Sequence, residues 1–291
     1  MYACWSSGLL LSCVALLLVG YMAFRGVQYI SLEMIFTNPA VGSSQADSGG
    51  FLSPILGTVI LTTIGTVIAL PFAVGAAVWL VEYGRPTWLA RAVESAIEVV
   101  AGTPSIVLAI FGLLLFSNKI FEPLSFAGDN GVVVGRSFLT AGAMMSLIAV
   151  PLIFTSTREA LLQIPAQVRE ASYALGKTKW ATIRKVLIPT VRPGIFTGTA
   201  LGMGRIAGDT AIVVVLLGAT LTLQPQGSGP IISTLRGSGS TLTSYVYNNS
   251  PSGEGNAPQK AYAAAFFLLI LVLILNFGVD VIARRSKKEI T

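Results

Sequence analysis

EASYALGKTKWATIRKVLIP, residues 170–189, is a polar and basic segment in a chain that is otherwise rich in apolar runs. It holds four Lys or Arg side chains. It has no apolar run long enough to cross a bilayer, which takes about 20 residues. Hydrophobic sequence continues on both sides of it. We therefore expect this segment to lie outside the membrane, held between membrane-embedded helices.

Local signals predict that this segment forms two short helices joined by a glycine turn. Pro165 suits the first position of a helix, because its missing N–H would have no partner there, and a helix is predicted over 166–175. Gly176 closes that helix, since glycine tolerates the left-handed conformation. Thr178 is expected to cap a second helix, which Pro189 ends. A rigid helix pair can transmit a push, whereas a flexible loop cannot.

This pattern resembles the coupling loop of ABC-importer permeases, written E-A-A-x-x-x-G, nine residues, then I-x-L-P. Glu170, Ala171, Gly176 and Pro189 stand at its positions, while Ser172 replaces the second Ala and Val-Leu-Ile replaces Ile-x-Leu. In that family the loop docks on a separate ATPase subunit and passes the motion of the ATPase to the membrane helices. The plainer alternative is a solvated basic linker.

The composition places the chain in the membrane class, with 53% hydrophobic and 11% charged residues. The lack of His excludes His-based acid–base catalysis and His metal sites. Gly176-Lys177-Thr178 looks like the end of a phosphate-binding P-loop, but Ala171 stands where the first Gly is required. We therefore expect a transport subunit and not an enzyme, with no cofactor, metal or nucleic-acid partner, and with ATP hydrolysis on another polypeptide.

Six hydrophobic runs predict six membrane-spanning helices in one all-α transmembrane domain, residues 1–291. The core of that domain is expected over 54–283, and the cytoplasmic loop with the coupling pattern over 157–192. The long polar connection 222–259 shows no clear element. The predicted spans are 8–24, 54–81, 98–116, 137–155, 194–221 and 261–283.

The distribution of positive charge predicts the orientation of the chain in the membrane. Thirteen Lys or Arg residues fall in 84–94, in 157–192 and in the tail after Ala283, whereas five fall in the connections on the opposite side. Positive residues in short connections mark the cytoplasmic side. Both termini are therefore predicted to be cytoplasmic.

Arg205 is a charged residue inside the predicted span 194–221, eleven residues after its start and sixteen before its end. A charge in the middle of a span costs about 2.5–3.5 kcal/mol on insertion scales. Asp209, four residues later, is expected on the same helix face and within pairing reach. The pair is either a salt bridge that locks the helix or an anion site. In the second case the guanidinium fork binds oxyanion oxygens, and Asp209 orients Arg205 and accepts a hydrogen from a protonated oxyanion.

Residues 205–211, RIAGDTA, resemble the R-A-x-G-E-T-A motif of phosphate ABC-importer permeases, with Asp209 in place of Glu. Residues 193–198, PGIFTG, resemble the P-G-I-x-T-G of the PstA-type subunit. The resemblance implies a type I ABC importer permease fold in a bacterial inner membrane, with Arg205, Asp209 and Thr210 on the path of inorganic phosphate. It also implies a second permease of the PstC type, a PstB-type ATPase dimer and an external PstS-type phosphate-binding protein as partners.

Several alternatives stay open at this point. A permease for sulfate, molybdate or another oxyanion would share the loop and differ at the site. An ATPase-independent secondary transporter often carries inverted repeats, and none is evident here, while a non-transporting scaffold would leave Arg205 unexplained. Gly194, Gly198 and Gly202 fit either packing within the chain or contact with a second permease. Pro104 fits either a kink in a packed helix or a break that frees backbone groups for a ligand.

Overall fold

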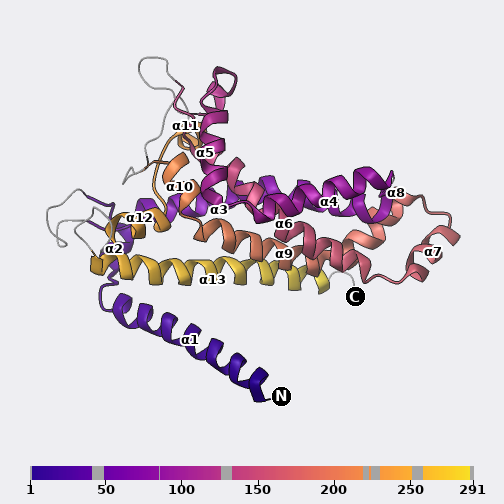
Figure 1. Cartoon of the computed structure of the whole chain (residues 1–291), viewed down its shortest axis with the longest axis horizontal. Coiled ribbons are helices and arrows are strands. Elements are labelled where there is room, and N and C mark those ends of the chain that lie inside the picture. Colours follow the sequence, from indigo (N-terminus) through magenta and orange to yellow (C-terminus); the bar gives the residue numbers. More distant parts are fainter. Residues whose placement is uncertain are drawn as a thin grey trace.

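The computed structural model describes residues 2–40, 49–84, 86–125, 133–218, 223, 230–250 and 258–288. These residues are mostly helical, and the β structure among them consists of isolated bridge residues, of which Pro39 pairs with Gly49. The elements, of which η1 and η3 are π-helical and η2 is a 3₁₀-helix, are α1 (Tyr2–Val27), α2 (Leu32–Phe36), α3 (Leu52–Val78), η1 (Trp79–Tyr83), α4 (Thr87–Gly102), α5 (Ser105–Phe116), η2 (Lys119–Leu124), α6 (Phe138–Leu162), α7 (Ala166–Ala174), α8 (Lys179–Thr182), η3 (Ile183–Leu187), α9 (Ile188–Gly208), α10 (Ala211–Leu216), α11 (Pro230–Arg236), α12 (Leu242–Asn249) and α13 (Pro258–Lys288). Figure 1 shows α3, α4, α6, α9 and α13 extending in one general direction, with α5 standing away from them.

Four helices are long and apolar enough to cross a membrane, and they confirm four of the six predicted spans. A fifth span is present if the bent pair α4–α5 is counted as one. By length and composition, four or five of the six predicted spans are thus found in the part of the chain that the structure describes. The four helical stretches are Cys4–Val27, Leu52–Tyr83, Phe138–Leu162 and Pro258–Ala283.

Helices α4 and α5 cover the predicted span 98–116, and they meet at a bend of 105°. Thr103, which precedes Pro104, is extended (φ −76°, ψ 128°), as the residue before a proline prefers. Its hydroxyl donates to the Val99 carbonyl oxygen at 2.7 Å and so satisfies one of the free carbonyls at the end of α4. Of the two predicted readings of Pro104, the structure therefore shows a break and not a kink in one continuous helix. Helix α4 also begins inside the predicted loop 84–94, in which Arg85 lies outside the described residues.

Helix α9 ends at Gly208, so the fifth predicted span, 194–221, is not one helix either. Asp209 is extended (φ −80°, ψ 130°), and α10 starts anew two residues later. Because α9 carries Arg192 and Arg205 among several Gly and Thr residues, it does not reach the hydropathy of a spanning helix. Residues 219–221 lie outside the described residues.

Pro189 does not end the second predicted helix, because α8 continues through η3 into α9. A π-helical turn is wider than an α-helical turn, which leaves room for a proline ring that would otherwise clash with the carbonyl four residues before it. The Thr190 hydroxyl donates to the Val186 carbonyl oxygen at 2.7 Å in the same region. The polar helix α8, the π-helical turn η3 and the helix α9 therefore form one continuous helix.

The hydrophobic core lies between α3, α6 and α9, and glycines bring α9 close to α6. A Cβ added to Gly198 would lie 2.9 Å from the Cα of Ile153, and one added to Gly194 would lie 2.5 Å from the Cβ of Ala160. Gly202 continues the row against α6. Small residues at this spacing permit such a close approach. The glycine row therefore serves packing within the chain, which is the first of its two predicted roles.

The connection 222–259, which showed no clear element in the sequence, contains α11 and α12 in its described part. Thr241 and Ser244 form a reciprocal capping box at the start of α12. Tyr245 is buried in a second small core with Phe51 and Leu242. Capping and burial together account for a helix where the sequence shows only a polar connection; residues 222, 224–229 and 251–257 lie outside the described residues.

Helix α1 packs on α13 near its own C-terminal end. The ring of Tyr21 meets that of Tyr262 edge-on, with centroids 6.1 Å apart, and Gly26 lies against the same turn of α13. From there α1 diverges from the other helices (Figure 1). Its apolar side chains are exposed in the isolated chain, Leu17 for example by 71%.

Candidate functional site

The coupling segment is defined here as α7, the turn at Gly176 and α8, residues 166–182. Its first helix agrees with the helix predicted over 166–175 to within one residue. Gly176 has a φ of 75°, as predicted for a left-handed turn. The N–H groups of Gly176 and Lys177 donate to the carbonyl oxygens of Tyr173 and Ser172 at 2.9 and 3.2 Å. This pair of bonds is a Schellman motif, which satisfies the last carbonyls of α7.

Helix α8 is capped as predicted and is joined to α7. The Thr178 hydroxyl oxygen accepts a hydrogen bond from the Ala181 N–H at 3.3 Å. The hydroxyls of Ser172 on α7 and Thr182 on α8 lie 2.8 Å apart, and both residues are buried. A buried hydrogen bond between the two helices, together with the closed turn, makes the segment a compact unit.

Three of the four predicted coupling residues lie on the exposed side of this segment. Glu170, Ala171 and Gly176 are exposed, whereas Pro189 is half-buried in α9 and away from the turn. Leu175, which sequence reasoning did not single out, is 77% exposed at the tip. Tyr173 and Trp180 of the same segment are exposed as well, and exposed apolar side chains gathered on one segment are typical of a contact surface.

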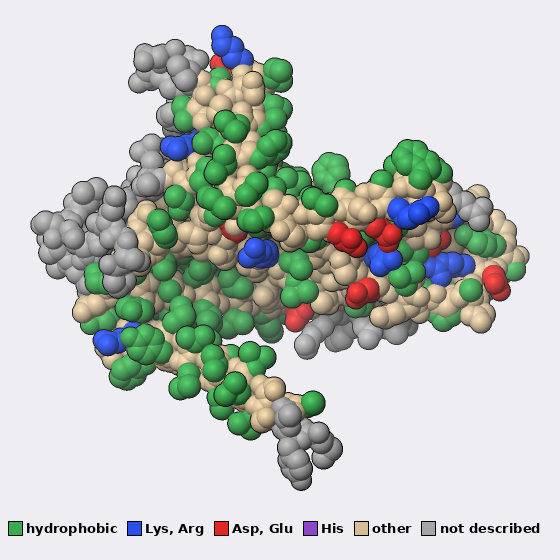
Figure 2. All heavy atoms as spheres, in the orientation of Figure 1, with side chains coloured by type: hydrophobic (Ala, Val, Ile, Leu, Met, Phe, Trp, Pro, Cys, Tyr) green, Lys and Arg blue, Asp and Glu red, His purple; other side chains and the backbone are tan. Residues whose placement is uncertain are grey.

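Charged side chains gather at the end of the molecule that carries α7 and α8, while apolar and neutral side chains cover most of the middle of the visible face (Figure 2). One ion pair at this end joins Arg158 on α6 to Glu94 on α4 at 2.8 Å, with both side chains about one-third exposed (38% and 33%). An exposed pair of this kind contributes about 0–1 kcal/mol to stability.

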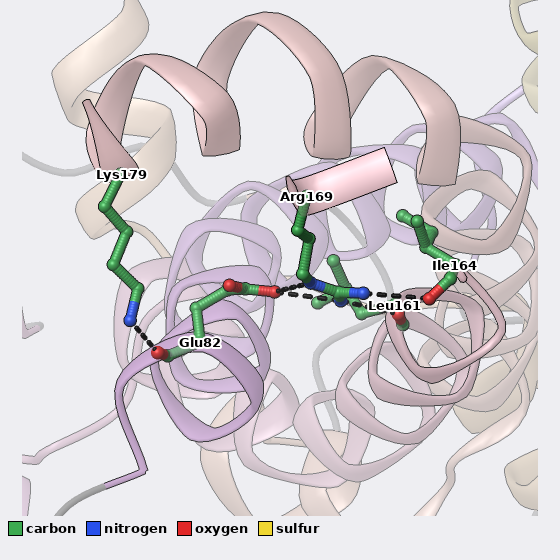
Figure 3. Close-up of polar contacts among 5 residues, drawn as sticks. All are labelled: Glu82, Leu161, Ile164, Arg169 and Lys179. Atoms are coloured by element: carbon green, nitrogen blue, oxygen red, sulfur yellow. Dashed lines mark hydrogen bonds and ion pairs between the residues drawn. The ribbon is translucent and has the colours of Figure 1, made fainter. Parts of the chain in front are cut away.

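A more buried ion pair joins the coupling segment to α3 and α6 (Figure 3). From α7, the Nε and Nη2 atoms of Arg169 each lie 2.9 Å from Oε1 of Glu82, which stands in η1 at the end of α3. Nη1 donates to the Ile164 carbonyl oxygen at 2.8 Å, and Nη2 donates to that of Leu161 at 3.1 Å. The guanidinium thus also supplies positive charge and donors to the C-terminal end of α6, where both are favourable.

A second cation of the coupling segment reaches the same residue. Lys179 at the start of α8 donates from Nζ to the backbone carbonyl oxygen of Glu82. Its ammonium also lies 4.5 Å from the centre of the Tyr83 ring, within the range of a cation–π contact. Sequence reasoning missed Glu82, Arg169 and Lys179, because Glu82 and Arg169 are 87 residues apart in the chain.

Arg205 lies in the last turn of α9, about 25 Å along the helix from its start at 1.5 Å per residue. The sequence placed it in the middle of a span, so its position is corrected to a helix end. There the partial negative charge of the helix C-terminus favours a cation. The side chain is exposed in the isolated chain. Among the described residues it makes no ion pair or hydrogen bond.

Asp209 does not pair with Arg205, contrary to the sequence prediction. Because the helix ends at Gly208, Asp209 is no longer on the helical face of Arg205. Its carboxylate is buried and accepts a hydrogen bond from the Ile212 N–H at 3.0 Å, in the manner of a side chain that caps the start of a helix, here α10. At the other end of α10, Nε of Arg136 donates to the Val215 carbonyl oxygen at 3.1 Å.

Hydroxyl groups surround the break between α9 and α10. The Thr243 hydroxyl donates to the Asp209 carbonyl oxygen at 3.2 Å. The Thr58 hydroxyl accepts from the Leu242 N–H at 2.9 Å. Thr210 is half-buried, and its carbonyl oxygen accepts from the N–H of Val214 at 3.0 Å. These contacts stabilise the helix break that leaves Arg205 at the end of α9.

A surface cavity of about 460 Å³ lies between α6 and the first turns of α9. Its polar lining includes Ser156, Glu159, Gln163 and Thr197. The cavity is therefore on the coupling-segment side of α9, and Arg205 is at the opposite end of that helix.

A family model described as the binding-protein-dependent transport system inner membrane component matches residues 69–288. The chain is 32% identical over 248 residues to the phosphate transport system permease protein PstC of Xylella fastidiosa strain Temecula1, covering 81% of this chain and 72% of that protein. It is 30% identical over 236 residues to the phosphate transport system permease protein PstA 1 of Mycobacterium tuberculosis strain CDC 1551, covering 81% and 71%. Both permease types stand among these relatives, so the likeness does not separate the two.

Two solved structures share the fold. One is a chain of the MetNI methionine ABC transporter in an inward-facing conformation, with a TM-score of 0.62, 21% identity and coverage of 81% of this chain and 95% of that chain. The other is a chain of a bacterial alginate ABC transporter in complex with alginate pentasaccharide-bound periplasmic protein, with a TM-score of 0.63, 14% identity and coverage of 97% and 94%. At these identities the likeness concerns the fold alone.

Proposed function

Because the chain belongs to the family of inner membrane components of binding-protein-dependent transport systems, we propose that it is the PstA-type permease subunit of an ATP-driven importer of inorganic phosphate. The chain is a multi-pass membrane protein with the fold of a type I ABC importer permease and is the permease component of such an importer. Phosphate as the substrate is supported by the names of the relatives of both permease types.

The observation that carries the proposal is the exposed guanidinium of Arg205 at the end of α9. A charged residue inside a membrane protein faces a protein interior or a water-filled path. In the assembled importer this chain supplies half of the path, and a PstC-type permease supplies the other half. Arg205 meets phosphate there as a transient cation. Asp209 and Thr210 serve the path by holding the helix break beside it.

The coupling segment is the part of the chain that meets the PstB-type ATPase dimer. Glu170, Ala171 and Gly176 lie on its exposed side, with Leu175 at the tip. ATP hydrolysis takes place on those ATPase subunits, and a PstS-type binding protein delivers phosphate on the opposite side of a bacterial inner membrane. The excess of Lys and Arg near the coupling segment favours cytoplasmic N and C termini.

Two other functions stay in competition with this one. A permease for sulfate or molybdate would have the same fold and coupling segment, and it would differ in which anion Arg205 meets. An ATPase-independent secondary transporter would not need an exposed docking tip such as the one at Leu175.

The docking part of the proposal is tested with Leu175→Asp in cells whose only phosphate importer includes this chain. Because Leu175 is 77% exposed, the substitution leaves the fold intact while placing a charge on the docking tip. We expect co-purification of the ATPase and ATP-dependent uptake of labelled phosphate to fall by about tenfold or more, which equals a loss of about 1.4 kcal/mol or more.

The matched control is Ile120→Asp, because Ile120 in η2 is 84% exposed and follows α5, away from the coupling segment. Co-purification of the ATPase and ATP-dependent phosphate uptake should both stay at the wild-type level in this variant. Wild-type co-purification and uptake in Leu175→Asp would remove the docking role, and phosphate uptake that continues after ATP is depleted would favour the secondary transporter.

A further inference from the structure

We propose that Glu82 is the residue through which both helices of the coupling segment act on α3, so that it transmits their movement to the membrane helices. The inference rests on the proposed function, in which an ATPase moves this segment. Glu82 is a positioning residue in this scheme and does not touch the substrate. The proposal is built on the contacts drawn in Figure 3.

The first contact comes from α7. All three guanidinium nitrogens of Arg169 are engaged, two with the Glu82 carboxylate and the remaining bonds with the Leu161 and Ile164 carbonyl oxygens. A guanidinium in a fixed fork geometry allows little rotation when each of its nitrogens is bonded. A displacement of α7 must therefore move Glu82 or break several charge-assisted bonds at once.

The second contact comes from α8 and reaches the backbone of the same residue. Lys179 donates to the Glu82 carbonyl oxygen. Glu82 lies in the π-helical turn η1, whose last hydrogen bond runs from the Gly84 N–H to the Trp79 carbonyl oxygen. Carbonyl groups at the end of a helix have no partner within it, and Lys179 supplies one. The carboxylate of Glu82 thus binds Arg169 of α7, and the main-chain carbonyl of Glu82 binds Lys179 of α8.

The described residues show no other route of this kind between the coupling segment and α3. Every hydrogen bond and ion pair found there between residues 166–182 and residues 52–84 ends on Glu82, and the cation–π contact of Lys179 ends on the adjacent Tyr83. The Ser172–Thr182 hydrogen bond holds α7 and α8 together, so the two cations move as a pair.

Burial separates this ion pair from the other one at the same end of the molecule. The Glu82 side chain is 5% exposed and that of Arg169 is 21% exposed, against 33% and 38% for Glu94 and Arg158. An exposed pair is largely screened by solvent, whereas removing one partner of a shielded pair leaves the other charge without compensation. The Glu94–Arg158 pair is therefore the natural control.

The experiment measures phosphate taken up per ATP hydrolysed by the complete importer in membrane vesicles. The variants are Glu82→Ala and Lys179→Ala, with Glu94→Gln and Lys177→Ala as matched controls. Lys177 and Lys179 are both exposed lysines of the coupling segment, and only Lys179 reaches Glu82. We expect Glu82→Ala to lower uptake per ATP by about 3- to 30-fold, which lies within the range for residues that couple distant sites, while the ATPase still co-purifies. Lys179→Ala should lower it by a smaller factor in the same direction.

The controls should stay within about twofold of wild type, which corresponds to about 0.4 kcal/mol. Wild-type uptake per ATP in both Glu82→Ala and Lys179→Ala would overturn the inference. A loss confined to Glu82→Ala would limit Glu82 to a local role at the end of α3 and would also overturn it. If Glu82→Ala does not accumulate in the membrane, the inference is tested by comparing uptake per ATP in Lys179→Ala with that in Lys177→Ala. Absence of ATP-dependent uptake in wild type and controls alike would instead contradict the proposed function.

Discussion

At the scale of single residues, Arg205 and Asp209 belong to different parts of the structure although they are four residues apart. Arg205 is exposed at the end of α9, and Asp209 is buried with its carboxylate on the Ile212 N–H. The carboxylate therefore stabilises the start of α10 and leaves the guanidinium without a partner among the described residues.

This division of roles predicts different effects for two substitutions of Asp209. Asp209→Ala removes the cap of α10 and should lower the free energy of unfolding by about 0.5–2 kcal/mol, whereas Asp209→Asn should stay close to wild type, because Asn caps a helix as well as Asp does. Thermal unfolding of the purified chain in detergent checks both. Equal destabilisation by the two substitutions would contradict the capping role and restore a role for the negative charge.

Residue-level signals in the sequence succeeded where the cause is local. Gly176 and Thr178 were recognised because a left-handed turn and a helix cap depend on neighbouring residues. The pairing of Arg205 with Asp209 failed because it assumed an unbroken helix. Glu82 and Arg169 were not recognised, since the fold brings them together from positions 87 residues apart.

At the scale of elements, the contact between α6 and α9 rests on glycine. A Cβ on Gly198 would lie 2.9 Å from both the Cα of Ile153 and the Cβ of Ser156. One of these atoms is main chain, which cannot rotate away. Gly204 on the same helix offers a contrast, because a Cβ there would meet only the side chain of Val272 at 3.8 Å.

Gly198→Ala should therefore destabilise the chain by about 1–3 kcal/mol through overpacking. Gly204→Ala should be neutral or stabilising by up to about 1 kcal/mol, because alanine favours a helix over glycine. Thermal unfolding of both variants in detergent gives the comparison. The packing account would be wrong if the two variants unfolded at the same temperature.

Elements were predictable from the sequence where hydrophobicity alone defines them. The helices α1, α3, α6 and α13 agree with four predicted spans. The sequence leaves a kink and a break open at Pro104 and does not predict the break at Asp209, because each break depends on side chains that satisfy freed backbone groups, such as the Thr103 and Thr243 hydroxyls. Helix α12 was missed because its burial against Phe51 is a tertiary effect.

At the scale of the whole molecule, one continuous helix links the coupling segment to Arg205. Helix α8 passes through η3 into α9, so the coupling segment stands at one end and Arg205 at the other. The Glu82 contacts tie the same end to α3, and the glycine row ties α9 to α6. In the proposed function, a displacement of the coupling segment would thus reach all three helices of the core.

The most direct test of phosphate as the substrate is labelled phosphate uptake by cells whose only phosphate importer includes this chain, measured for wild type and Arg205→Lys with and without excess sulfate or molybdate. We predict that excess sulfate or molybdate leaves wild-type phosphate uptake unchanged. It should fall by about tenfold or more in Arg205→Lys, because Lys keeps the charge but loses the fork, and one charge-assisted hydrogen bond contributes about 1.5–3 kcal/mol. Uptake displaced by sulfate or molybdate, or unchanged in Arg205→Lys, would contradict the assignment of phosphate to the Arg205 path.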